Sequence, residues 1–134
     1  MMKYLYPFLF FTAFTYSGFT AANPVNSLLS EYRQQGATTF SAEAGKQLWL
    51  TPFTDKETGK DRDCTHCHTS NLKNTGKHIS TGKIIQPMAP SVNPERLTDI
   101  KKINKWFIRN CKWTLGRECT AQEKGDVLLY LQSQ

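Results

Sequence analysis

The sequence predicts an all-α domain, and three observations support this fold class. Apolar residues recur at helical spacing in four segments, near residues 24–35, 41–52, 98–108 and 120–131. A residue type that favours helix starts stands at the beginning of each segment. No segment alternates apolar and polar residues convincingly, as a half-buried strand would. The 134-residue chain contains no internal repeat or low-complexity stretch, so we expect one small domain.

The first two expected helices lie in the N-terminal half of the chain. Asn23-Pro24 has the composition of a cap followed by proline at the first helical position, and Gly36 ends this helix. Ser41 begins the second helix, which runs to Pro52. The polar residues 54–63 then form a solvent-facing loop.

The other two expected helices lie in the C-terminal half. Thr98 or Asp99 caps the third helix. Thr120 and Glu123 have the spacing of a capping box, which opens the last helix. Residues 69–94, between the two pairs of helices, show almost no periodicity and predict a long loop.

The segment Cys64-Thr65-His66-Cys67-His68 is the most informative stretch of the chain. Cys-x-x-Cys-His is the spacing at which two thiols are joined covalently to the vinyl groups of a haem. We therefore expect one haem c, attached through Cys64 and Cys67, with His68 as the proximal iron ligand. The long loop that follows would cover the face and edge of this haem. His66 lies inside the motif and is directed away from the iron.

A zinc site and a redox dithiol are the alternatives for a Cys-x-x-Cys pair. Zinc requires a second pair of ligands at similar spacing, whereas Cys111 and Cys119 lie far downstream and farther apart. A thioredoxin-like dithiol requires a βαβ context, and none is visible before Cys64. The motif therefore favours covalent haem attachment.

Residues 1–22 have the features of a cleaved signal peptide, which leaves residues 23–134 as the haem domain. Lys3 precedes an apolar run rich in Phe and Leu, and small residues end near Ala22. The run is interrupted by Pro7 and is shorter than the roughly 20 residues of a membrane-spanning helix. We expect a periplasmic protein, because haem is attached to such motifs outside the cytoplasm.

The expected haem domain is mildly basic. Residues 23–134 contain 16 Lys and Arg against 11 Asp and Glu, a formal charge of +5 before the haem propionates are counted. This excess would guide an acidic redox partner toward the haem edge. No basic run is interleaved with aromatic residues, so we expect no nucleic-acid binding.

The second axial position of the iron decides what such a protein does, and the residues leave the distal ligand open. Met88 lies in Pro87-Met88-Ala89-Pro90, which resembles the methionine loops of electron-transfer cytochromes c. A thioether there would close the site. His78 would instead supply a second imidazole. Chain geometry alone does not choose between a closed carrier and an open site.

Several runs of the chain resemble the sphaeroides haem protein family, whose members are small, high-spin, oxygen-binding monohaem cytochromes c. The resemblance covers nearly all of residues 23–134. It implies a class I cytochrome c-like fold, in which Gly45, Trp49 and Tyr130 match the crossing of the N-terminal and C-terminal helices. The runs that carry it are Thr81–Ser91, Thr98-Asp99, Lys105-Trp106, Arg109-Asn110-Cys111 and Leu115–Thr120.

The resemblance also implies the distal ligand and the redox partners. In this family the distal ligand is an asparagine directly before the first cysteine of a disulfide, which here is Asn110 before Cys111 paired with Cys119. The usual electron donors are a di-haem cytochrome c and a membrane b-type cytochrome. One departure is Met88, where the family carries leucine, and Met88 stays the alternative distal ligand.

A physical reading of Asn110 agrees with that role. Its amide is a neutral, weak ligand that ferric iron, the harder acid, tolerates better than ferrous iron. Reduction would then open the site to dioxygen, nitric oxide or carbon monoxide. We thus expect a periplasmic electron-transfer and gas-binding cytochrome. The alternatives are a closed carrier ligated by Met88 and a nitric-oxide-converting haem enzyme, for which no general acid or base can be placed.

Overall fold

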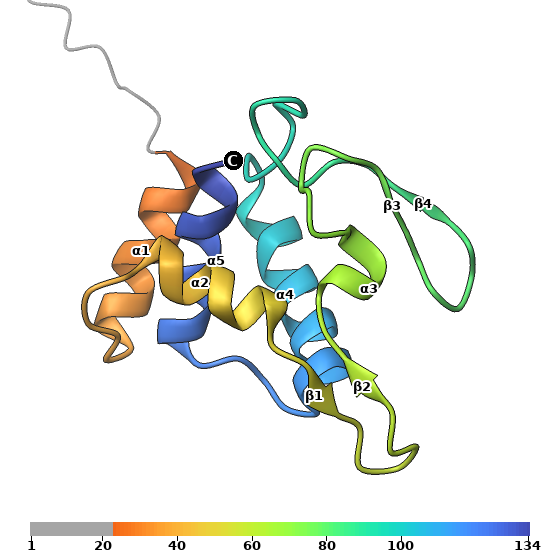
Figure 1. The fold of residues 1–134 in the computed structure, drawn as a ribbon. Coiled ribbons are helices and arrows are strands. Elements are labelled where there is room, and N and C mark those ends of the chain that lie inside the picture. The colour runs from red at the N-terminus through yellow and green to blue at the C-terminus, as the bar shows by residue number, and fades with distance from the viewer. Residues whose placement is uncertain (1–22) are drawn as a thin grey trace, which may run out of the picture.

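The computed structural model describes residues 23–134, which form five helices and two short hairpins (Figure 1). The expected signal peptide lies outside these residues. Within them, no helix is both long and apolar enough to cross a bilayer. The elements are α1 (Pro24–Gln34), α2 (Ala42–Leu50), β1 (Phe53–Thr54), β2 (Asp61–Arg62), α3 (Thr65–His68), β3 (Gly76–Lys77), β4 (Ile84–Ile85), α4 (Ile100–Leu115) and α5 (Ala121–Gln132).

Side-chain caps begin the four long helices at the expected positions. Asn23, Ser41 and Asp99 each accept a hydrogen bond from a backbone N–H in the first turn of the helix that follows. Thr120 does the same, and Glu123 accepts a reciprocal bond from the Thr120 N–H at 2.8 Å. The predicted capping box is therefore confirmed, and local chemistry accounts for where these helices start.

The expectation of a chain without strands is wrong in one respect. β1 pairs with β2 and β3 pairs with β4, in two antiparallel hairpins. Each strand has only two residues, which is too few for an alternating pattern to be visible in the sequence. The β3–β4 hairpin lies inside a segment predicted as a loop, and the β1–β2 hairpin begins one residue before the other predicted loop, at Phe53. The domain remains mostly helical.

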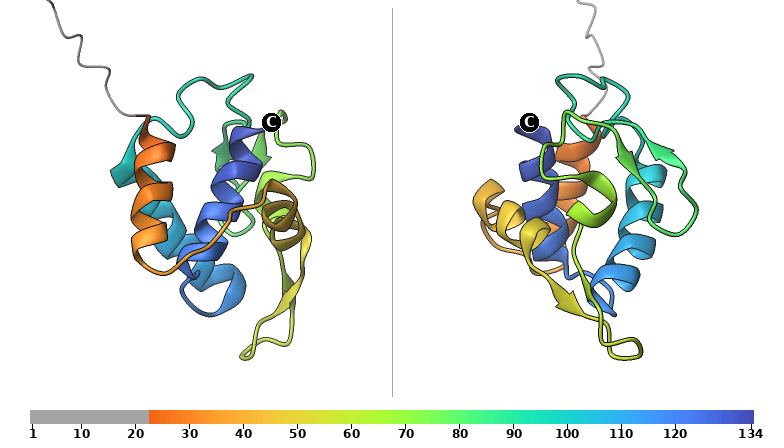
Figure 2. Two further views of the ribbon diagram at one scale, coloured as in Figure 1. Left: turned by 90° about the vertical axis from the view of Figure 1, so that its left-hand side faces the viewer. Right: turned by 45° about the vertical axis from the view of Figure 1, so that its right-hand side comes forward.

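Helix α2 packs across α5, as the resemblance implies. Gly45 of α2 lies so close to the backbone carbonyl of Asp126 in α5 that a Cβ atom at this position would collide with it. Beside the crossing, the rings of Trp49 and Tyr130 pack edge to face with centroids 6.1 Å apart. Figure 2 (left) shows α1 and α2 on either side of α5.

Two clusters of buried side chains form the core. The first joins α1, α4 and α5 and consists of Val25, Leu28, Leu29, Tyr32, Phe40, Ile103 and Leu128. The second joins α2 and α5 to the long loop and consists of Trp49, Leu72, Ala89, Val127, Tyr130 and Leu131. The second cluster adjoins the Cys-x-x-Cys-His motif, because Cys64 packs against it.

Candidate haem-binding site

A cavity of about 580 Å³ lies between α2, α3, α4 and α5. This volume is within the roughly 300–1,000 Å³ that is usual for cofactor and ligand sites. The structure brings to this one cavity every residue considered from the sequence as a haem attachment point or iron ligand. They are Cys64, Cys67, His68, His78, Met88 and Asn110.

The attachment motif is built on the single turn of α3. Cys64 caps this helix, and Cys67 and His68 lie at its end, so the three side chains reach the same cavity. The β3–β4 hairpin packs directly on the Cys-x-x-Cys-His motif, since a Cβ atom at Gly76 would collide with the carbonyl oxygen of Cys67. His66 does not line the cavity, and its Nδ1 lies 3.0 Å from Oδ1 of Asp63 instead.

The environment of Cys64 argues against a redox-active dithiol. Neither Cys64 nor Cys67 forms a disulfide. Burial, together with Asp63 and Cys67, raises the pKa of the Cys64 thiol to about 12. Thiol–disulfide exchange requires the thiolate, so this thiol is a poor nucleophile at neutral pH. Zinc is disfavoured on another ground, because the described residues contain no group of three or more His, Cys, Asp or Glu side chains that could hold a metal ion.

His68 is held in the form that binds iron. Its ring lies 5.4 Å from the ring of Trp49, and its Nδ1 is buried without a hydrogen-bond partner among the described residues. Burial, together with the nearby charge of Arg96, lowers the pKa of His68 to about 4. The imidazole is therefore neutral at physiological pH, as an iron ligand must be. Two thiols, a neutral buried imidazole and an apolar cavity together fit a c-type haem.

Helix α4 forms the cavity wall that carries Asn110. Residues spaced three and four apart present one face of this helix to the cavity. The Asn110 amide makes no hydrogen bond to another described side chain or backbone group. The next residue, Cys111, is joined to Cys119 by the predicted disulfide, with Cα atoms 5.5 Å apart. The cavity-facing side chains of α4 include Ile103, Trp106, Phe107, Asn110, Trp113 and Thr114.

The segment around Met88 is tied down by hydrogen bonds. The N–H groups of Met88 and Ala89 both donate to the carbonyl of Leu72, at 2.9 and 3.0 Å. The Met88 side chain packs against the cluster that contains Trp49 and Leu72. Trp49, a member of this cluster, also contacts His68.

Arg96 is a cavity residue whose role was not predicted from the sequence. Its guanidinium donates to the carbonyls of Pro87 and Gln86, at 2.7 and 2.6 Å. Asn93 also donates to the Pro87 carbonyl, at 2.9 Å. The side chains of Arg96 and Asn93 therefore fix the backbone just before Met88 by hydrogen bonds. No local pattern in the sequence indicates these contacts, because they depend on how the loop folds back on itself.

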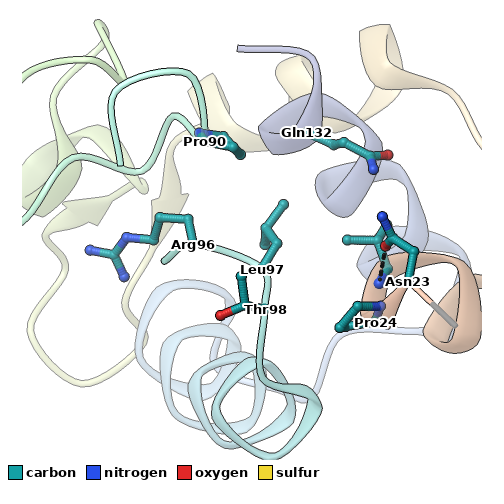
Figure 3. Close-up of a pocket in the computed structure, with 8 residues that line it drawn as sticks. Asn23, Pro24, Pro90, Arg96, Leu97, Thr98 and Gln132 are labelled. Carbon is teal, nitrogen blue, oxygen red and sulfur yellow. Dashed lines mark hydrogen bonds between the residues drawn. The ribbon is translucent and has the colours of Figure 1, made fainter. Parts of the chain in front are cut away.

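A second, smaller pocket of about 240 Å³ lies behind this loop, between the start of α1 and the end of α5 (Figure 3). Arg96 and Leu97 line both the larger cavity and this smaller pocket, so the segment that they form separates the two. In Figure 3 the Arg96 side chain extends away from Asn23 and Gln132. The predicted iron ligands lie in the larger cavity alone.

The fold and the larger cavity define a c-type haem protein, and known proteins with similar sequences agree. Residues 35–131 match a family described as Domain of unknown function (DUF1924). Cytochrome c-type protein SHP of Cereibacter sphaeroides is 38% identical over 110 residues, which are 80% of this chain and 81% of SHP. Cytochrome c'' of Methylophilus methylotrophus is 45% identical over 76 residues, which are 57% of this chain and 53% of that protein.

Solved structures show the same relationship. Oxidized SHP, described as an oxygen-binding cytochrome c, matches with a TM-score of 0.73 and 37% identity, covering 82% of this chain and 96% of SHP. Oxidized cytochrome c'' of Methylophilus methylotrophus matches with a TM-score of 0.72 and 34% identity, covering 83% of this chain and 94% of the other. The chain therefore belongs to the DUF1924 family and is a cytochrome c of the SHP type, with one covalently attached haem.

Proposed function

We propose that this protein is a periplasmic electron-transfer cytochrome whose distal haem face opens on reduction and binds a diatomic gas such as dioxygen or nitric oxide. The observation that carries the proposal is Asn110, whose amide lines the haem cavity with no hydrogen bond to hold it in place. Two relatives support it: SHP is described as oxygen-binding, and the solution structure of cytochrome c'' is described in terms of haem-ligand detachment.

Four residues of the chain would hold the haem in this account. Cys64 and Cys67 would attach it as thioethers, His68 would be the proximal iron ligand, and Asn110 would be the distal one. When bound, the haem supplies an iron that carries one electron and, in the ferrous state, binds diatomic gases. The Asn110 amide would bind the harder ferric ion better than the ferrous ion, so it would be released on reduction. The released amide could then donate a hydrogen bond to a bound gas.

Two features of the cavity walls favour Asn110 over Met88 as the distal iron ligand. The segment on either side of Met88 is fixed by hydrogen bonds to Leu72 and from Arg96. Met88 also packs with the cluster that contacts the proximal histidine. Asn110, by contrast, lies on helix α4, whose cavity-lining residues include the aromatic side chains Trp106 and Phe107. A bound gas would therefore lie near aromatic side chains and the Asn110 amide.

Electrons would come from other redox proteins. The resemblance to the sphaeroides haem protein family favours a di-haem cytochrome c and a membrane b-type cytochrome as donors. Among the described residues, those of α4 that line the cavity include no histidine or carboxylate to act as a general acid or base, so we propose electron transfer and gas binding rather than catalysis.

Optical spectra of the oxidised holoprotein test the distal ligand. We expect a high-spin ferric spectrum in the native protein, a substantial change in Asn110→Ala, and little change in Met88→Ala. The matched variants each remove one candidate ligand from the same cavity. A low-spin native spectrum that changes only in Met88→Ala would replace this proposal with a closed, methionine-ligated carrier.

A further inference from the structure

The charges of this protein are divided between two parts of the chain. Residues 64–117 contain ten Lys and Arg but only two acidic residues, a formal charge of +8. The remaining described residues, 23–63 and 118–134, contain six Lys and Arg and nine acidic residues, a formal charge of −3. The net charge of +5 for residues 23–134 is therefore the sum of a positive central segment and negative flanking segments.

The positive part of the chain contains much of the haem site. Residues 64–117 form α3, the β3–β4 hairpin, the long loop and α4. Lys83, Lys102 and Arg109 line the haem cavity. Other basic residues of this part lie on the outward surface of α4.

The outward face of α4 carries a continuous basic stripe. Lys101, Lys105, Ile108 and Lys112 are spaced four, three and four residues apart, so they share one helix face, and all four are exposed. Lys112 pairs with Glu118, whereas Lys101 and Lys105 form no ion pair with a described residue.

An exposed apolar side chain lies among these lysines. Ile108 is 47% exposed and does not line the haem cavity. Its exposure is therefore not explained by the space that the haem fills. The surface of α4 formed by Lys101, Lys105 and Ile108 is termed the basic face below.

We propose that the basic face is the docking surface for an acidic electron-transfer protein. Carboxylates of the partner would face the lysines, and a small apolar patch would cover Ile108. Transient redox complexes have small interfaces, below about 1,200 Å², and oriented charge raises their association rates. Each encounter passes one electron from the reduced centre of the partner to the haem iron, which changes from ferric to ferrous. The inference rests on the proposed function, because it assumes a haem that exchanges electrons.

Voltammetry of the holoprotein on coated gold electrodes tests the orientation of this surface. A carboxylate-terminated monolayer serves as the acidic probe, and an ammonium-terminated monolayer serves as its opposite. Lys101→Glu/Lys105→Glu alters the basic face. Lys46→Glu/Lys56→Glu makes the same change in net charge at exposed lysines of α2 and the β1–β2 hairpin. Lys101→Gln/Lys105→Gln removes the charges without reversing them.

We expect fast electron transfer on the carboxylate surface for the native protein and for Lys46→Glu/Lys56→Glu, weakening as salt is added. The rate should fall by about tenfold in Lys101→Glu/Lys105→Glu and by a smaller factor in the Gln variant. Equal losses in the two Glu variants would show that only net charge matters and would overturn the proposal. So would tight binding to anionic phosphatidylglycerol vesicles combined with slow electron transfer on the carboxylate monolayer.

Carbon monoxide binding and optical spectra distinguish a wrong docking surface from a wrong proposed function. None of the substituted lysines lines the haem cavity, so carbon monoxide binding and the optical spectra should be the same in all variants. A closed distal site would appear in those spectra for the native protein, whatever the electrode measurements show.

Discussion

Arg62 and Trp113 join the two sides of the haem site. The guanidinium carbon of Arg62 lies 4.8 Å from the ring centroid of Trp113, and Nη1 donates to the Trp113 carbonyl at 3.1 Å. The same guanidinium pairs with Asp55 at 2.7 Å. Arg62 is two residues before the first haem cysteine, and Trp113 is three residues after Asn110. The β1–β2 hairpin therefore holds the part of α4 that carries the expected distal ligand.

Replacing Arg62 by Gln should loosen this end of α4. The change removes a cation–π contact and a hydrogen bond to a helix carbonyl, so the free energy of unfolding should fall by about 1–2 kcal/mol. Asn110 would then be held less precisely, and the ferric spectrum should change as well. Urea denaturation and optical spectra of the holoprotein measure the two effects.

Arg33 offers a matched control for that experiment. Its guanidinium lies 5.1 Å from the ring centroid of Phe40, but neither residue lines the haem cavity. Arg33→Gln should therefore lower stability by a similar or smaller amount and leave the ferric spectrum unchanged. Equal spectral effects in Arg33→Gln and Arg62→Gln would show that Arg62 has no positioning role.

The disulfide after Asn110 should contribute measurably to stability. Cys111 and Cys119 close a short loop at the end of α4. Chain-entropy estimates for such a loop give roughly 2–3 kcal/mol, so Cys111→Ser/Cys119→Ser should lower the free energy of unfolding by that amount. Equilibrium denaturation of the purified holoprotein checks this. A loss below about 0.5 kcal/mol would mean that contacts within the folded α4 end, rather than the cross-link, hold the loop in place.

The start of α5 should lose stability in acid. Hydrogen bonds from Arg117, at 2.8 and 2.6 Å, hold the pKa of Glu123 below its ordinary value of 4.5, despite partial burial. A carboxyl whose pKa is lowered by folding stabilises the protein above its unfolded pKa, and this contribution disappears as the pH falls through the folded pKa.

Glu123→Gln isolates this charge, because glutamine can still accept the hydrogen bond from the Thr120 N–H. We expect the variant to be about 0.5–1 kcal/mol less stable at pH 7, since the ion pair is partly exposed. The difference from the native protein should shrink as the pH falls below 4.5 and vanish once the native carboxyl is protonated. A difference that stays constant between pH 7 and pH 3 would rule out the ionic contribution.

The crossing of α2 and α5 should not accept a larger residue than glycine. A methyl group at Gly45 would collide with the Asp126 carbonyl, so Gly45→Ala should cost about 1–3 kcal/mol in spite of its better helix propensity. Ala44→Gly, at the exposed neighbouring position, should cost about 1 kcal/mol through helix propensity alone. Thermal unfolding of both variants gives the comparison. A stabilising effect of Gly45→Ala would mean that the two helices can move apart.

Sequence alone predicted the parts of this protein that depend on local chemistry. The starts of the four long helices follow from Asn23, Ser41, Asp99 and Thr120, because a cap acts within its own turn. The haem motif is equally local. The two hairpins were missed, because strands of two residues leave no periodic signal.

Contacts between distant segments explain the rest of what was missed. Arg62 and Trp113 are 51 residues apart, and neither residue type has a fixed partner at a fixed spacing. Arg96 binds carbonyl groups, and every residue has a carbonyl, so the sequence does not indicate which one it selects. Such contacts follow from the folded path of the loop.

Carbon monoxide binding to the reduced native holoprotein tests the central claim most directly. If Asn110 leaves the iron on reduction, the ferrous protein is high-spin and five-coordinate. Carbon monoxide should then bind without a slow preceding step and shift the optical spectrum. A low-spin ferrous spectrum that carbon monoxide does not alter would contradict the account, because a strong ligand such as Met88 or His78 would then close the site.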